Sequence, residues 1–158
     1  MFRRFSLSVR SILLLLVIFT GQNAAPPSGC AALSEAFVKA RLAYWQPRLE
    51  LQSWRISVVL SQASDLKPNT LGNIYWDGAN KTAVIRILDP SGYSVSCPST
   101  IQDMEVTLVH ELVHLELSSL PRSHSSRGEE EHAVNRITDA LLGLERHGDS
   151  SAQITASR

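Results

Sequence analysis

Five consecutive residues, His110-Glu111-Leu112-Val113-His114, combine the residue types that a metal site needs. Histidines four residues apart lie on one face of an α-helix, one turn from each other, so both imidazoles can bind a single metal ion. A zinc ion lowers the pKa of a coordinated water molecule toward about 7, and a neighbouring glutamate can then accept its proton. The pattern therefore predicts one Zn²⁺ ion held by His110 and His114, with Glu111 as the catalytic residue.

The alternative interpretation of the pattern is a pair of core histidines that bind no metal. The surrounding segment, residues 101–118, is apolar on most sides, which predicts a helix buried in the centre of a domain. Burial of two imidazoles and a carboxylate in such a helix is costly unless a partner compensates for the lost hydration. A metal ion is such a partner, so we favour the metal site.

A catalytic zinc site also needs a third protein ligand and one open coordination position. The metzincin continuation H-E-x-x-H-x-x-G-x-x-H is absent, because Leu117 and Leu120 stand where its glycine and third histidine belong. The next predicted helix begins with three glutamates, residues 129–131, and His124 precedes it as a weaker candidate. A run of acids is also typical of a stable helix N-terminus, which accounts for one or two of the three.

The segment Glu131-His-Ala-Val-Asn135 resembles the downstream motif of the thermolysin-like gluzincins. In that family a glutamate ligand is followed, four residues later, by a carboxylate or an amide that supports a zinc-bound histidine. The resemblance covers residues 109–115 and 130–142. It implies that Glu131 is the third ligand, with Glu130 as the next candidate, and that Asn135 supports a ligating histidine. The layout looks most like the compact, single-domain minigluzincins.

The resemblance implies zinc-dependent hydrolysis of peptide bonds in a peptide or protein substrate. Tyr93 and His124, which flank the predicted metal-binding helix, are the candidates for stabilising the transition state. One alternative is a non-catalytic, zinc-stabilised binding domain (a pseudo-protease), in which Cys97 or His124 would close the fourth coordination position. Another is hydrolysis of a non-peptide amide, which the same chemistry permits.

The sequence predicts that these residues are positioned by an α+β domain over residues 26–146. A linker at 26–30 precedes its first helix, and a disordered tail follows at 147–158. Apolar periodicity predicts three helices, at residues 33–51, 101–118 and 127–144, and three strands, at residues 55–61, 71–76 and 82–88. We expect a small, mostly antiparallel three-stranded sheet packed on the H-E-x-x-H helix and the glutamate helix.

Two boundaries within this domain carry specific expectations. Thr100-Ile-Gln-Asp103 is a candidate capping box that would start the H-E-x-x-H helix. Ser126-Arg-Gly-Glu129 is a second candidate, at the start of the glutamate helix. In the families that the chain resembles, the strand before the metal-binding helix, here residues 83–88, is a sheet edge that lines the cleft, where an extended substrate could pair.

Residues 1–25 have the layout of a secretory signal peptide, with three arginines followed by an apolar run at 12–19 that is too short to span a membrane comfortably. We expect an exported protein, periplasmic or secreted. The alternative is an uncleaved N-terminal anchor, with membrane association through this segment. Cys30 and Cys97 fit the exported context, where they would form one disulfide, and two free thiols are the alternative.

The charge balance disfavours one class of partner. The chain has 15 basic and 15 acidic residues, and removal of residues 1–25 takes away three arginines and no acids, which leaves a net charge of −3. No basic stripe remains on any predicted element. Nucleic-acid binding is therefore not expected.

Overall fold

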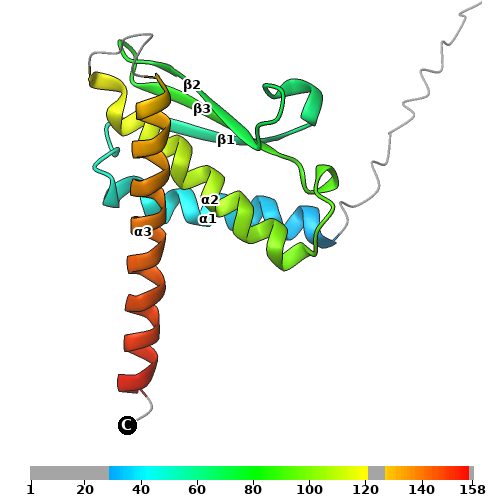
Figure 1. Cartoon of the computed structure of the whole chain (residues 1–158), viewed down its shortest axis with the longest axis vertical. Coiled ribbons are helices and arrows are strands. Elements are labelled where there is room, and N and C mark those ends of the chain that lie inside the picture. The colour runs from blue at the N-terminus through cyan, green and yellow to red at the C-terminus, as the bar shows by residue number, and fades with distance from the viewer. Residues whose placement is uncertain (1–28, 121–126, 157–158) are drawn as a thin grey trace, which may run out of the picture.

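The computed structural model describes residues 29–120 and 127–156 (Figure 1), so the predicted signal segment and His124 lie outside the described residues. The elements in chain order are α1 (Gly29–Arg48), β1 (Arg55–Ser61), η1 (Ala63–Asp65), β2 (Gly72–Asp77), β3 (Thr82–Leu88), η2 (Pro90–Gly92), α2 (Cys97–Glu116), η3 (Leu117–Ser119) and α3 (Arg127–Ala156). The predicted α+β class is confirmed. No helix in the described ranges is both long and apolar enough to cross a membrane.

The sheet has the strand order β1-β3-β2, and it is mixed. β2 and β3 form an antiparallel hairpin, whose turn is stabilised by backbone N–H groups of Ala79 and Asn80 that donate to the Asp77 carboxylate. The chain reverses once between β1 and β2 and again at this hairpin, so β1 runs parallel to its neighbour β3. The predicted antiparallel pairing therefore holds only for β2 and β3.

β3 lies in the centre of the sheet, and the prediction that residues 83–88 form an edge is wrong. Its residues Ala83, Ile85 and Ile87 are buried against the helices. The order leaves β1 and β2 as the two edge strands, and β2 is the one that lies against α2. Any pairing of an extended peptide on this side must therefore involve β2.

α2 is the central element of the fold, with the sheet on one side, α1 along another and α3 across its C-terminal half (Figure 1). Nine of its residues are buried, which are Thr100, Met104, Thr107, Leu108, Val109, Glu111, Leu112, Val113 and Leu115. The second half of α2 is buried on most sides, in agreement with its apolar sequence, whereas Ser99, Gln102 and Asp103 in the first half are exposed. Two of the nine belong to the cleft described below.

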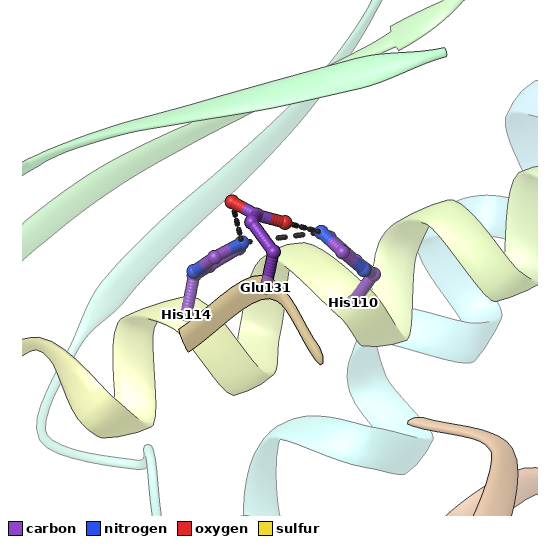
Figure 2. Close-up of side chains that lie close together, drawn as sticks. All are labelled: His110, His114 and Glu131. Carbon is purple, nitrogen blue, oxygen red and sulfur yellow. Dashed lines mark hydrogen bonds and ion pairs between the residues drawn. The ribbon is translucent and has the colours of Figure 1, made fainter. Parts of the chain in front are cut away.

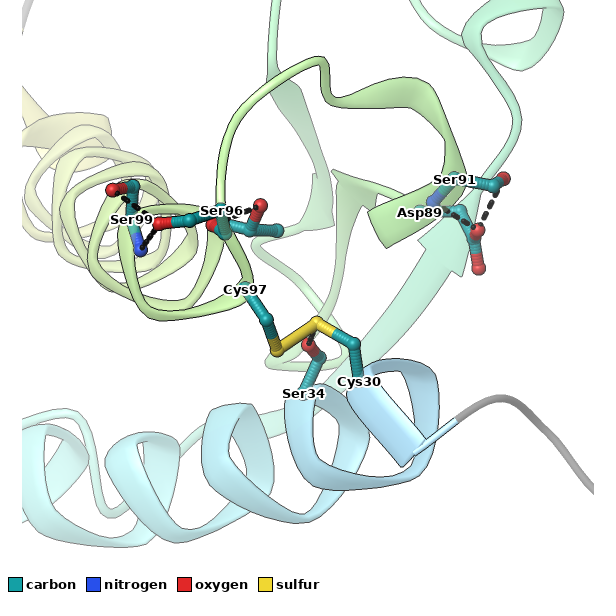
Figure 3. The surroundings of a disulfide bond; sticks show 8 residues. Cys30, Ser34, Asp89, Ser91, Ser96, Cys97 and Ser99 are labelled. Carbon is teal, nitrogen blue, oxygen red and sulfur yellow. Dashed lines mark hydrogen bonds between the residues drawn. A yellow bond between two sulfur atoms is a disulfide. The ribbon is translucent and has the colours of Figure 1, made fainter.

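The N-terminus of α2 is capped by Ser96, whose hydroxyl accepts a hydrogen bond from the Ser99 backbone N–H at 3.4 Å. The capping box predicted at Thr100 is wrong, because Thr100 lies inside the first turn and is buried there. A disulfide joins Cys97 in this turn to Cys30 in the first turn of α1 (Figure 3). Of the two states that the sequence left open for these cysteines, the structure has the disulfide, and residues 29 and 30 belong to α1 rather than to a linker.

α3 begins at Arg127, close to its predicted start, and continues to Ala156. It passes the predicted end near Leu144 and makes most of the predicted tail helical, and its C-terminal half extends away from the body of the protein (Figure 1). Residues 145–156 contain no proline, and the single Gly148 costs a helix only about 1 kcal/mol. Nothing in the sequence therefore stops the helix where apolar periodicity ends.

Arg41 connects the three helices. Its guanidinium donates to Glu105 of α2 and to Glu145 of α3, and all three side chains are largely buried. The Trp45 indole donates to the same Glu105 carboxylate at 3.2 Å. The guanidinium also lies 4.3 Å from the centroid of the Tyr44 ring. These contacts set the position of α3 relative to α2, on which the site described below depends.

We predict that Arg41→Ala lowers the free energy of unfolding by about 2 kcal/mol, because two partly buried carboxylates lose their cation. Urea denaturation at neutral pH measures the effect. The matched control is Arg48→Ala on the same helix, where the arginine is exposed and stacks on Tyr44. Equal losses in the two variants would contradict the role assigned to Arg41.

Candidate metal centre

The cleft of the protein lies between the second half of α2, the edge strand β2 and the first turns of α3. It has a volume of about 760 Å³. The wall from α2 consists of Val106, Thr107, His110, Glu111 and His114, which recur at a spacing of three or four residues. They form one stripe of the helix, while other residues of the same half pack into the core, which are Leu108, Val109, Leu112, Val113 and Leu115.

His110, His114 and Glu131 meet at one point of this cleft (Figure 2). The two Nε2 atoms are 3.1 Å apart, and the Glu131 carboxylate lies 3.5 Å from Nε2 of His110 and 3.3 Å from Nε2 of His114. The three candidate ligand atoms all lie within 4.8 Å of one another. The predicted trio is therefore brought together in an arrangement that could hold a metal ion.

The chemistry of these donors fits a metal ion. Burial, followed by the neighbouring His114, lowers the pKa of His110, which favours the neutral imidazole that binds metals. No further histidine, cysteine or carboxylate donor joins this group within the part of the chain that the structure describes. Two imidazoles and one carboxylate are a donor set that could hold a metal ion.

Each histidine of the cluster has a further partner on α3. The Glu130 carboxylate lies 3.2 Å from Nδ1 of His114, which leaves Nε2 of that ring directed at the cluster. Asn135 is close enough to His110 to contribute to its pKa, in the direction that raises it. Partners of this kind fix the ring orientation of a metal ligand and raise its basicity. Glu130, which the sequence offers as an alternative ligand, contacts the outer nitrogen instead.

Glu111 lines the same cleft and is only 7% exposed. Burial, followed by the negative charge of Glu131, raises its pKa to about 7, whereas Lys67 acts in the opposite direction. A carboxylate with this pKa can both accept and release a proton near neutral pH.

A glycine lets β2 approach the helix beside this glutamate. A Cβ atom at Gly72 would lie 2.4 Å from Cγ2 of Thr107 and 2.9 Å from the Arg86 carbonyl oxygen, and it would be 3.5 Å from Oε1 of Glu111. A larger residue would therefore force the first residue of β2 away from α2. The wall of the cleft opposite Glu111 depends on this close contact.

Other candidates from the sequence are not part of the cluster. Tyr93 does not line the cleft, because it packs against the core near Asp103, seven residues before His110 on α2. Its pKa is raised to about 12 by burial and then by Asp103. Cys97 is bonded to Cys30 and cannot act as a ligand. His124 lies outside the described residues.

The chain matches no protein-family model, no curated protein and no solved structure. The interpretation of the site therefore depends on the geometry and chemistry of its own residues.

We predict that Glu131→Ala lowers the affinity for Zn²⁺ by more than about a hundredfold, because a direct ligand is worth more than the outer partners, whose loss typically costs 10- to 100-fold. Glu130→Ala should fall within that smaller range. Glu129→Ala, an exposed change on the same turn, is the matched control. Competition with a chromophoric chelator measures the affinities, and full zinc retention in Glu131→Ala would remove this ligand from the site.

In the chelator-treated protein, Glu111 should make stability depend on pH. Folding raises its pKa from 4.5 to about 7, so the folded state binds this proton more tightly than the unfolded state. The stabilisation is complete below pH 4.5 and is lost as pH rises to about 7, which amounts to about 3 kcal/mol. Glu111→Gln should therefore match the wild type near pH 4 and exceed it by that amount at pH 8 in urea unfolding. Parallel pH profiles would contradict the assignment.

Proposed function

We propose that this protein is a compact zinc metallopeptidase that hydrolyses peptide bonds, with an active site similar to that of the gluzincins. The observation that carries the proposal is the position of Glu111 in the same cleft as the ligand trio, buried and with a pKa near neutrality. A metal that only stabilises the fold does not require a base beside it. The open side of the cluster is consistent with room for a substrate.

In this proposal His110, His114 and Glu131 hold one Zn²⁺ ion. The ion supplies Lewis-acid polarisation of a water molecule and of the substrate carbonyl when it is bound. Glu111 accepts a proton from the attacking water at a carboxylate oxygen and later donates it to the leaving amine. Glu130 and Asn135 keep the two imidazoles in the orientation that ligation requires.

The edge strand β2 is the proposed platform for the substrate. β2 pairs with β3 on one side only, and Gly72, Asn73, Ile74 and Trp76 of this strand line the cleft. An extended peptide could add to the free edge through backbone hydrogen bonds, with side chains on alternate sides. Such pairing would hold a peptide bond across the stripe of α2 that carries the histidines.

Export of the protein is part of the same proposal. The Cys30–Cys97 disulfide supports it, because disulfides persist in oxidising compartments such as the periplasm and the extracellular space. A peptidase in such a compartment would act on exported or imported peptides and proteins.

We predict that Glu111→Gln retains one equivalent of Zn²⁺ but loses hydrolysis of a fluorogenic peptide library by about 10²- to 10⁴-fold, the usual contribution of a general acid–base. Glu129→Gln is the control, since it removes an exposed carboxylate from α3. Cleavage by Glu111→Gln at the wild-type rate would exclude the mechanism. A wild-type protein that binds zinc tightly but cleaves no library member would favour the zinc-stabilised binding domain instead.

A further inference from the structure

One positively charged side chain lines the cleft among the residues that the structure describes, and it belongs to Lys67. The same cleft is lined by the carboxylates of Glu111, Glu130 and Glu131. The ammonium of Lys67 interacts electrostatically with Glu111, yet none of the ion pairs found within the described residues involves Lys67. Within the described residues, the charge of Lys67 is therefore not neutralised by a direct ion pair.

The backbone that carries Lys67 is fixed at several points. Leu66 is buried, and the carbonyl of Lys67 accepts hydrogen bonds from the Thr70 backbone N–H at 3.2 Å and from the Thr70 hydroxyl at 2.9 Å. The carbonyl of Leu71 then accepts from the Leu88 N–H at 2.8 Å, where β2 joins the sheet. Lys67 is thus held by the same segment that leads into the cleft wall at Gly72.

The distribution of charge in the cleft is uneven. With neutral imidazoles and a bound dication, the three carboxylates leave a net charge of −1 at the metal end, and Lys67 brings the cleft to neutrality. An anionic group of a substrate would be repelled by uncompensated carboxylates but attracted to this ammonium, with which it can form a charge-assisted hydrogen bond. The cleft therefore offers a carboxylate one preferred position on the β2 side.

We propose that Lys67 gives the cleft a preference for peptides with a carboxylate close to the scissile bond. The carboxylate comes from an aspartate or glutamate side chain or from a free C-terminus, since both present the same chemistry to the ammonium. This inference rests on the proposed peptidase function and adds a substrate class to it. Lys67 acts as a specificity-determining residue, and the proton transfers stay with Glu111.

Matched peptides test the preference in the zinc-loaded full chain. One series places Glu or Gln at each position of an otherwise neutral octapeptide, and a second compares a free with an amidated C-terminus. We expect kcat/KM to be about fivefold higher for the carboxylate member at one position or in the second series, as for a well-placed ion pair at a partly exposed site. The series that shows the difference identifies the source of the carboxylate.

Substitutions of Lys67 link the preference to this side chain. Lys67→Met should abolish it, Lys67→Arg should keep most of it, and Lys67→Glu should reverse it toward peptides that carry lysine. Lys39→Met is the matched control, because Lys39 is exposed on α1 and pairs with Glu35 away from the cleft. A preference that survives in Lys67→Met, or a wild type that does not distinguish the paired peptides, would overturn the proposal.

Binding measurements keep this proposal distinct from the proposed hydrolysis. Fluorescence anisotropy with labelled Glu and Gln peptides is carried out on zinc-loaded Glu111→Gln and on Glu111→Gln combined with Lys67→Met. If the wild type cleaves nothing but the first variant binds carboxylate peptides about fivefold more tightly than the second, only the hydrolase proposal fails. If peptides are cleaved or bound with no dependence on Lys67, only the specificity proposal fails. Absence of both cleavage and binding would overturn both.

Discussion

The burial of polar side chains on α2 is the constraint on which the rest of the structure depends. A helix that packs into the core on most of its sides also carries His110, Glu111 and His114, and buried polar groups cost free energy unless they gain partners. α2 supplies no carboxylate partner for the imidazoles other than Glu111, and most of its remaining side chains beside them are aliphatic. The partners come from the first turns of α3, where Glu130 and Glu131 contact the imidazoles. The fold must therefore bring the start of α3 against the end of α2.

Several contacts far from the cluster serve this requirement. Arg41 ties α1 to both other helices through Glu105 and Glu145, so the angle at which α3 crosses α2 is set more than one turn away from the histidines. At the opposite end of α2, the disulfide at Cys97 joins its first turn to α1. On the side of the cleft formed by the sheet, Gly72 lets β2 lie against α2 beside Glu111. The elements that bound the cleft are thus each held in place by contacts outside the histidine cluster.

The parts of this architecture that local sequence encodes were predictable. Helical periodicity and the four-residue spacing place His110 and His114 on one face of α2, and the motif resemblance adds Glu131 and Asn135. The pairing of β1 with β3 was not predictable, because the neighbour of a strand is set by contacts between distant segments. The capping of α2 was misassigned because serine and threonine both offer suitable hydroxyls within four residues of each other.

The parts of the site that the sequence left open depend on how elements turn toward one another. Glu130 and Glu131 are equivalent as residue types, and only the rotation of α3 about its axis decides which carboxylate meets Nε2 and which meets Nδ1. Lys67 follows a short 3₁₀ turn, and no motif marks it. Its place in the cleft follows from β2 being the edge strand, which is itself a result of the sheet order.

The same charges explain why the cluster suits a metal ion better than a purely structural role. Without a cation, Glu131 adds to the effect of burial in raising the pKa of Glu111, so its negative charge opposes ionisation of Glu111. A bound dication would reverse the sign of the local field and favour ionisation of Glu111. The binding of a metal would then prepare the base in the same event that assembles the ligands. A cluster that only joined α2 to α3 would gain nothing from the buried carboxylate of Glu111, and its loss would relieve repulsion with Glu131.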